Sequence, residues 1–157
     1  MKIVLIVIGK TVEEWLKKGI QNYVERIEHF APFEIQVIPD LKNTKNMDTS
    51  TQKEREGESI IKLLQRGDDV ILLDDKGMEM TSEDMSAWMD KKMSLSVKRL
   101  VFIIGGPYGF SKDVYDSANS KLSLSKMTFS HQMVRLIFVE QLYRAFTIIN
   151  GMPYHHS

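Results

Sequence analysis

The sequence predicts a single α/β domain over residues 1–157, built on a mostly parallel sheet with helices on both faces. Two observations support this fold class. Short apolar segments of strand length alternate along the chain with longer segments whose apolar residues recur at helical spacing. The first segment, Ile3 to Ile8, is apolar at every position, as expected for a strand buried on both faces of a parallel sheet. A chain of 157 residues is long enough for one domain with a full core and short for two.

Strands and helices are expected to alternate in the first half of the chain. The expected elements are, in order, a strand at residues 3–8, a helix at about 12–30, a strand at 34–38, a helix from about 52 that ends before Gly67, and a strand at 70–73. The first helix is predicted from Trp15, Ile20 and Val24, which recur at the spacing of one helix face. A polar stretch, residues 40–50, is expected to form a loop, and residues 74–77 a turn.

The second half of the chain repeats this alternation. Ser82 is expected to cap a helix whose inner face carries Met85, Trp88 and Met89. The elements that follow are a strand at 100–104, a short helix from Ser111, a strand at 122–124, and a final helix that Ser130 caps and that runs to about Ile149. Strands separated by helices in this way favour parallel pairing with helices on both faces of the sheet.

The final helix carries apolar residues in almost every direction around its axis. A helix that is apolar all round must be covered on more than one side. One side can meet the sheet of the same domain, and the other is expected to meet a second copy of the chain in a two-fold symmetric homodimer. Phe138 and Leu142 are expected to lie on this outward side.

The composition excludes several kinds of site and partner. The chain has no cysteine, so it cannot form disulfides, thiolate zinc sites or a cysteine nucleophile. Its net charge is zero, which argues against a general nucleic-acid binder. The charge is uneven, however, because residues 98–157 carry seven basic and three acidic residues, whereas residues 1–97 carry fourteen basic and eighteen acidic ones. The apolar run near the start is far too short for a membrane span and no cleavage site follows, so a cytoplasmic protein is expected.

Two loops in the last third of the chain point to a small-molecule pocket. The sequence GGPYGF, at 105–110, follows one predicted strand, and the polar turn SKMTFSH, at 125–131, follows another. Glycines at the carboxyl end of a parallel strand let a ligand approach backbone groups closely. The glycines lack the spacing of a dinucleotide fingerprint, and the chain has no Walker sequence. A pocket built mainly from backbone is therefore expected, although a tight strand-to-helix turn would also explain the glycines.

The stretches GGPYGF, LSLSKMTFSHQMVRLIFVEQLYRAF and the terminal PYHH resemble small bacterial methyltransferases of the SPOUT (α/β-knot) superfamily. Within it they are similar to the family that methylates N3 of a pseudouridine in large-subunit (23S) ribosomal RNA. The resemblance extends over nearly the whole chain, including MKIVLIVIGK and VILLDDKG. It implies a C-terminal trefoil knot, and S-adenosylmethionine as methyl donor, with no metal. A neutral chain of this size would bind isolated RNA weakly, so the substrate is expected to be the assembled ribosome or large subunit.

The resemblance also implies the residues of the methyl-donor site. It assigns to the site Leu73, Gly105, Leu124, Ser125, Lys126, Met127, Thr128 and Phe129. All of them lie at or just after the carboxyl ends of predicted parallel strands, where open α/β sheets bind ligands.

Arg135, Arg144, Tyr154 and His155 are the candidate RNA-binding residues, and Arg135, Tyr154 and His155 the candidate catalytic ones. Arg135 interrupts an apolar surface near the predicted pocket, where its guanidinium could hold a phosphate or a uracil carbonyl. Arg144 lies four residues after Glu140, so a helical ion pair is the other interpretation. Tyr154 and His155 suit stacking on a base and contact with its edge, and His155 could accept the N3 proton. A helix of roughly 28 Å separates this tail from the SKMTFSH turn, so the tail is expected to reach a partner subunit's pocket.

The chain has two pairs of adjacent aspartates that could suggest a metal site. Asp68–Asp69 and Asp74–Asp75 are interpreted as solvated turns, since neither pair has a further ligand at a metal-binding spacing.

Two other functions stay open. The chain could be a methyltransferase of the same superfamily that acts on tRNA, or a non-catalytic ribosome-binding protein that keeps the fold.

Overall fold

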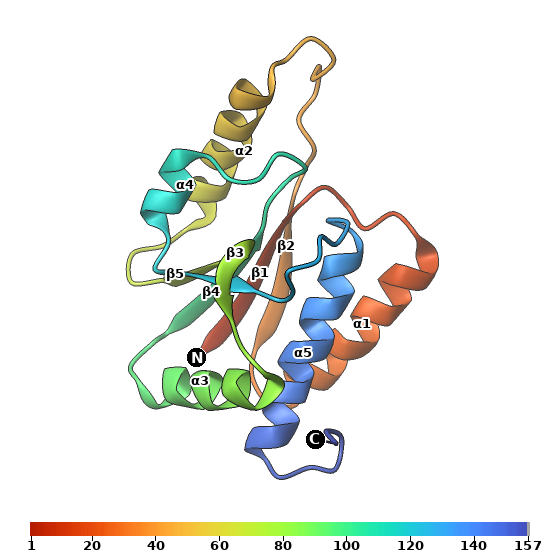
Figure 1. Ribbon diagram of the computed structural model, residues 1–157, viewed down its shortest axis with the longest axis vertical. Helices are drawn as coiled ribbons and strands as arrows, with labels where there is room; N and C mark the ends of the chain where they lie inside the picture. The colour runs from red at the N-terminus through yellow and green to blue at the C-terminus, as the bar shows by residue number, and fades with distance from the viewer. Residues whose placement is uncertain (157) are drawn as a thin grey trace.

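The computed structural model describes residues 1–156 and is built on one sheet of five parallel strands in the order β2-β1-β4-β3-β5 (Figure 1). The strands are β1 (Lys2–Ile8), β2 (Phe33–Ile38), β3 (Asp69–Glu79), β4 (Arg99–Ile104) and β5 (Ser120–Ser123). The helices are α1 (Glu14–Glu28), α2 (Thr49–Leu63), α3 (Ser82–Ser94), α4 (Lys112–Ser117) and α5 (Met133–Ile149). The predicted α/β class and the parallel sheet are confirmed, and the knot stays a prediction.

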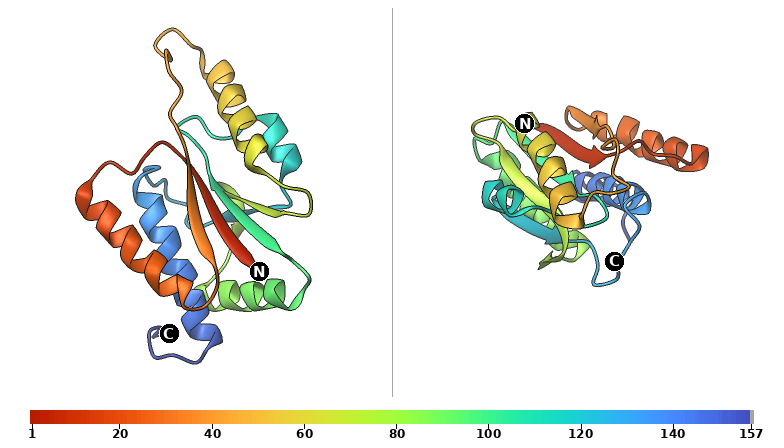
Figure 2. Two further views of the ribbon diagram at one scale, coloured as in Figure 1. Left: turned by 180° about the vertical axis from the view of Figure 1, so that it is seen from behind. Right: turned by 90° about the horizontal axis from the view of Figure 1, so that it is seen from above.

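The two faces of the sheet carry separate cores because successive side chains of a strand point to opposite faces. In β1, Ile3 and Leu5 join the core formed with α1, α3 and α5. Val4 and Ile6 of the same strand join the core formed with α2 and α4. All four side chains are fully buried, which explains why this strand is apolar at every position. Figure 2 shows α1 beside α5 and α2 beside α4 from two further directions.

Short polar side chains fix where the helices begin. Asp48 accepts a hydrogen bond from the backbone N–H of Thr51 at 2.7 Å, so α2 begins at Thr49 and shortens the predicted loop. Thr81, and not Ser82 as predicted, caps α3, where it forms a capping box with Asp84. Ser111 caps α4 as predicted.

Strand β3 is longer than predicted because it continues past a bulge. Leu73 and Met78 both pair with Leu122 of β5, so residues 74–77 are extra residues on the β3 side. Gly77 lets the bulged strand return to the sheet, since a Cβ at this position would lie 2.7 Å from the backbone nitrogen of Leu122. The bulge replaces the predicted turn, and it turns Asp74 and Asp75 towards the carboxyl edge of the sheet, where they line a pocket.

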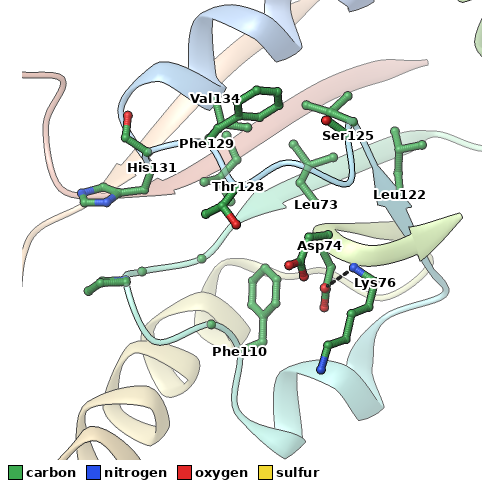
Figure 3. A pocket seen from close by; sticks show the side chains of 18 of the residues that line it. Leu73, Asp74, Lys76, Phe110, Leu122, Ser125, Thr128, Phe129, His131 and Val134 are labelled. Carbon is green, nitrogen blue, oxygen red and sulfur yellow. Dashed lines mark hydrogen bonds between the residues drawn. The ribbon is translucent and has the colours of Figure 1, made fainter. Parts of the chain in front are cut away.

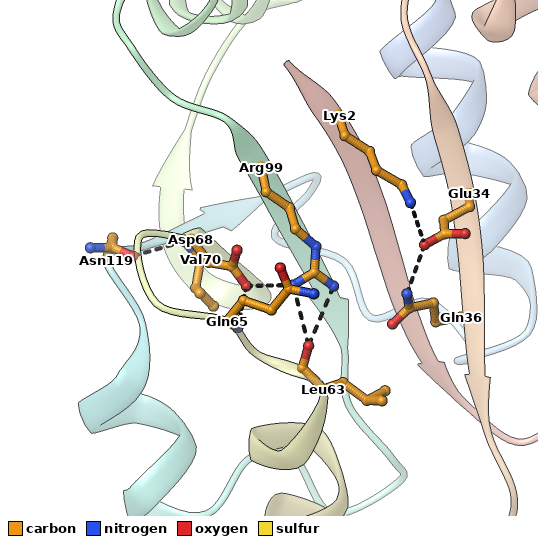
Figure 4. Close-up of polar contacts among 9 residues, drawn as sticks. All are labelled: Lys2, Glu34, Gln36, Leu63, Gln65, Asp68, Val70, Arg99 and Asn119. Carbon is orange, nitrogen blue, oxygen red and sulfur yellow. Dashed lines mark hydrogen bonds and ion pairs between the residues drawn. The ribbon is translucent and has the colours of Figure 1, made fainter.

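Polar contacts join the amino ends of the strands (Figure 4). The guanidinium of Arg99 donates to Asp68 at 2.8 Å, and the Asp68 side chain is only 4% exposed. Asn119 accepts a hydrogen bond from the backbone N–H of Val70 at 2.7 Å, which ties the start of β5 to β3. Lys92 pairs with Asp69 in the same region. The prediction that Asp68 and Asp69 form a solvated turn is therefore wrong, because both carboxylates are held in partly or fully buried ion pairs.

Helix α5 turns a different side to the core than predicted. Phe138 and Leu142, which were expected to face outward, are fully buried in the core of their own chain. The outer stripe of the helix instead contains Met133, Ile137 and Ile148, which remain at least partly exposed. A partner subunit would therefore have to cover this second stripe.

Candidate functional site

A cavity of about 580 Å³ opens at the carboxyl edge of the sheet, where a strand bulge and two loops converge (Figure 3). The bulge belongs to β3 and the two loops follow β4 and β5, and the first turn of α5 closes one side with Val134. A volume of this order suits a ligand of cofactor size. The position agrees with the rule that open parallel sheets bind ligands beyond the carboxyl ends of their strands.

The loop after β4 presents backbone to the cavity. Gly109 adopts a φ of +82°, and its N–H donates to the carbonyl of Gly106 at 3.2 Å, which closes a tight turn. At Gly105 a Cβ would lie 3.0 Å from the ring of Phe110, which also lines the cavity. Any side chain at Gly105 would therefore push Phe110 or enter the space between the loops.

Serine side chains shape the loop after β5. Ser123 donates to the carbonyl of Ser125 at 2.9 Å, and the Ser125 hydroxyl accepts from the N–H of Met127 at 2.9 Å. Ser130 was predicted to cap α5; Gln132 directly precedes the helix and its side chain makes no cap, but the Ser130 hydroxyl accepts from the N–H of Met133, the first helical residue, at 3.0 Å. Met127 is 77% exposed, so the loop presents an apolar side chain to solvent at the rim of the cavity.

One wall of the cavity is acidic. The hydroxyl of Tyr115 donates to Asp74 at 2.6 Å, and the backbone N–H of Lys76 donates to the same carboxylate at 2.9 Å. Partial burial disfavours the charged carboxylate, but these hydrogen bonds outweigh it and lower the pKa of Asp74. Partial burial and the contact with Asp74 raise the pKa of Tyr115 to about 12. Asp74 is thus a fixed negative charge beside the cavity, and not the solvated turn residue predicted.

Seven of the eight predicted cofactor residues line the cavity. They are Leu73, Gly105, Leu124, Ser125, Met127, Thr128 and Phe129. Lys126 is not among the lining residues: its side chain is 81% exposed, and its ammonium group lies 3.9 Å from Glu79.

The sequence interpretation missed other lining residues, which include Asp74, Asp75, Phe110, Tyr115 and His131. A usable signal existed for four of them. Asp74 and Asp75 directly follow the predicted strand at 70–73, Phe110 ends the GGPYGF motif, and His131 ends the SKMTFSH turn. Tyr115 carried no such signal, because it reaches the cavity from α4.

Arg135 lies inside the protein and not at the mouth of the cavity. It is 2% exposed, and its guanidinium donates to the carbonyls of Ile8 at 2.8 Å and Gly9 at 2.9 Å. It also donates to the Thr11 hydroxyl and to the carbonyl of His131. Burial lowers its pKa from the ordinary arginine value. With its donors occupied in this way, Arg135 holds the end of β1 against α5, and the expectation that it contacts substrate finds no support in this geometry.

The other three candidate residues form a cluster at the far end of α5. Arg144 donates to Glu140 at 2.6 Å and to Nδ1 of His155 at 3.0 Å, and its guanidinium lies 4.8 Å from the centre of the Tyr154 ring. The Nε2 atom of His155 lies 2.7 Å from Glu83. Since an arginine can only donate, Nδ1 of His155 accepts, and Nε2 carries the proton given to Glu83.

Helix α5 separates this tail cluster, which comprises Glu83, Glu140, Arg144, Tyr154 and His155, from the cavity. Its 17 residues span about 25 Å, with the cavity at its start and the tail at its end (Figure 1). None of the five residues lines the cavity. Within one chain the predicted catalytic tail and the predicted cofactor loops therefore do not meet.

Residues 1–156, the part of the chain that the structure describes, contain neither a metal-binding cluster nor a membrane-spanning helix. No group of three or more histidine or acidic side chains there is arranged to hold a metal ion. No helix in that range is long and apolar enough to cross a membrane.

Comparisons with known proteins give the same family over nearly the whole chain. A family model described as "Predicted SPOUT methyltransferase" matches residues 1–155. The chain is 61% identical to the "Ribosomal RNA large subunit methyltransferase H" of Bacteroides fragilis and 59% identical to that of Parabacteroides distasonis. It is 47% identical to the protein of the same name from Porphyromonas gingivalis. Each of these alignments covers 100% of both chains.

Proposed function

Because this chain belongs to the SPOUT methyltransferase family, we propose that it transfers the methyl group of S-adenosylmethionine to N3 of a pseudouridine in large-subunit ribosomal RNA. The observation that carries the proposal is the cavity at the carboxyl edge of the sheet, which seven of the eight family-assigned residues line. Relatives that are named as large-subunit ribosomal RNA methyltransferases, and that match over their whole length, support the same substrate.

The residues of the cavity fit the methyl donor. The loops after β4 and β5 offer backbone groups to an adenosyl moiety, and a Cβ at Gly105 would lie 3.0 Å from the ring of Phe110, which lines the same cavity. The fixed carboxylate of Asp74 suits a ligand that carries a positive charge. When bound, the donor supplies an electrophilic methyl group on its sulfonium, which needs no metal.

The chain's own residues have to position the base and remove its proton. The N3 proton must leave before or during the attack on the methyl carbon, and negative charge then spreads over N3 and the flanking carbonyls. Fixed donors and cations that face these atoms would stabilise that charge. In the cluster of one chain, the Nδ1 lone pair of His155 is occupied by Arg144, so His155 can accept a proton only once Arg144 releases it.

We assign the tail to the cavity of a second subunit. Along α5, Arg144 lies about 15 Å beyond Val134, which lines the cavity of its own chain, and Tyr154 and His155 follow the end of the helix. The outer stripe of α5, with Met133 and Ile137, leaves apolar surface for a homodimer contact. In such a dimer Arg144, Tyr154 and His155 contact the RNA base, while Arg135 acts as a positioning residue inside each subunit.

A methylation assay with purified components tests the proposal. Purified protein is incubated with radiolabelled S-adenosylmethionine and with ribosomes, large subunits, free ribosomal RNA or tRNA from a strain that lacks the modification. We expect label in ribosomes, at one pseudouridine of the large-subunit RNA, and little in free RNA. Label in tRNA instead would identify a different methyltransferase, and ribosome binding without label would identify a non-catalytic protein. Either result would overturn the proposal.

A further inference from the structure

Glu56 is a buried carboxyl group with an incomplete set of partners. It lies on α2 and is 5% exposed. One oxygen, Oε2, accepts a long hydrogen bond of 3.3 Å from the side chain of Gln52. The other, Oε1, is buried and has no hydrogen-bond partner among the described residues. A buried polar atom without a protein partner is uncommon and calls for an explanation by strain, by function or by a bound water.

The carboxyl group of Glu56 presses against the glycine loop after β4. A Cβ at Gly106 would lie 2.5 Å from Oε1 and 2.8 Å from Oε2, so the carboxyl group occupies the space that a side chain there would need. The neighbouring residue, Gly57, packs equally closely against Ser111 at the start of α4. Residues 106–111 are therefore held by α2 at both ends, through Glu56 and through Gly57.

Gly106 lines the cavity, whereas Glu56 does not. The carboxyl group thus lies behind the loop after β4, on the side away from the cavity wall. We propose that Glu56 is a positioning residue for the methyl-donor loop: its carboxyl group braces the Gly106 backbone and sets how far the loop extends into the cavity. This inference rests on the proposed function, because it takes the cavity to be the methyl-donor site.

The surroundings of Glu56 favour the uncharged carboxyl group. Burial raises its pKa, and the nearby carboxylate of Asp40 adds to this, while the hydrogen bond from Gln52 and the imidazole of His131 act in the opposite direction. Asp40 follows β2 and His131 precedes α5, and these are the ionisable groups that face Glu56 from other elements. An uncharged carboxyl group can donate its O–H to a loop carbonyl, whereas the ionised form can only accept.

The first experiment measures the affinity for S-adenosylmethionine by calorimetry between about pH 5 and pH 8. Glu56→Gln keeps a neutral donor and acceptor in the same space, so we expect affinity close to wild type. Glu56→Ala should weaken binding about tenfold, which corresponds to about 1.4 kcal/mol. The affinity of the wild type should fall relative to Glu56→Gln as the pH rises. Glu58→Gln, an exposed change on the same helix, is the matched control and should follow the wild type at every pH.

The second experiment is a double-mutant cycle with Gly106→Ala. The added methyl group would meet the Glu56 carboxyl group, so it should weaken binding strongly in the wild type and much less in the Glu56→Ala background. Equal losses in both backgrounds, or wild-type affinity in Glu56→Ala, would overturn the role of Glu56. A wild-type protein that binds no S-adenosylmethionine would overturn the proposed function instead, so the two failures are distinguishable.

Discussion

The two ends of α5 carry two different kinds of site. At its start, the cavity is built from glycines, backbone groups and short serine hydrogen bonds, and Asp74 is held by one hydroxyl and one backbone N–H. At its end, the tail cluster consists of charged and aromatic side chains that contact one another, with Arg144 at its centre.

Because the two ends are built differently, they are expected to respond differently to substitutions and deletions. A Cβ added at Gly77, Gly105 or Gly106 would meet backbone, the Phe110 ring or the Glu56 carboxyl group, so enlarging substitutions at these positions are expected to be harmful. At the tail end the groups that matter are the side chains themselves, so deleting them is harmful.

The largest effect is expected from Gly105→Val at the cavity end. The branched side chain would start 3.0 Å from the ring of Phe110 and fill space between the loops. We expect no measurable binding of S-adenosylmethionine by calorimetry, with cooperative thermal unfolding retained. Normal affinity in a folded variant would show that the cavity is not the methyl-donor site.

Next in size is the loss of assembly in Ile137→Glu. Ile137 lies on the outer stripe of α5, so the charge would be buried without a partner in a dimer contact. Sedimentation should show a dimer for the wild type and a monomer for the variant, which should have lost ribosome methylation. Leu95→Glu makes the same kind of change at a position that is 54% exposed and off the stripe, and should leave the dimer intact. A monomeric wild type would contradict the shared site.

Deleting residues 153–157 should affect the role of the tail cluster but not that of the cavity at the other end of α5. Binding of S-adenosylmethionine should stay within a few-fold of normal, while ribosome methylation falls at least about tenfold, the factor that ~1.4 kcal/mol represents. Loss of base stacking by Tyr154 alone accounts for about 1–3 kcal/mol.

Mixed dimers test which subunit uses the tail. A tail-deleted subunit is paired with a Gly105→Val subunit, so that one intact cavity and one intact tail lie on different chains. If the tail acts in the partner's cavity, the mixture should recover activity that neither parent has. Mixtures as inactive as the parents would contradict the assignment.

The smallest effect is expected from Tyr115→Phe, which removes the hydroxyl that donates to Asp74. The hydrogen bond lowers the Asp74 pKa, so its contribution to stability is present above the ordinary carboxyl range near about pH 4 and is lost as the pH falls. Thermal melts should therefore place the variant below the wild type at neutral pH, with a difference that shrinks in acid. Tyr108→Phe, at another tyrosine that lines the cavity, is the control and should show no such difference. A Tyr115→Phe difference that is constant with pH would argue against this role of Asp74.

The sequence predicted well those features that depend on neighbouring residues. Apolar runs placed the strands, Ser111 and Ser130 marked helix starts, and the two loops that form the cavity followed from their motifs and the family resemblance. These features are local, because the residues that determine them are close together in the sequence.

The features that the sequence did not predict depend on partners far along the chain. Arg135 looks like a substrate-binding arginine because its acceptors are carbonyls 126 and 127 residues away, which leave no mark near it. The extension of β3 depends on how Gly77 passes the backbone of Leu122. An all-apolar helix likewise does not reveal which stripe faces its own core, so Phe138 and Leu142 were placed on the wrong side.

The bond between Arg135 and the carbonyl of Ile8 has a consequence for biosynthesis. The two residues are 127 positions apart, so translation at 5–20 residues per second separates their appearance by about 6–25 s. During that time β1 has left the ribosome without the guanidinium that will fix its end. The chain therefore completes the cavity only after its last helix has been released, and a protein truncated within α5 should be an unstable target for proteases, not a partly active enzyme.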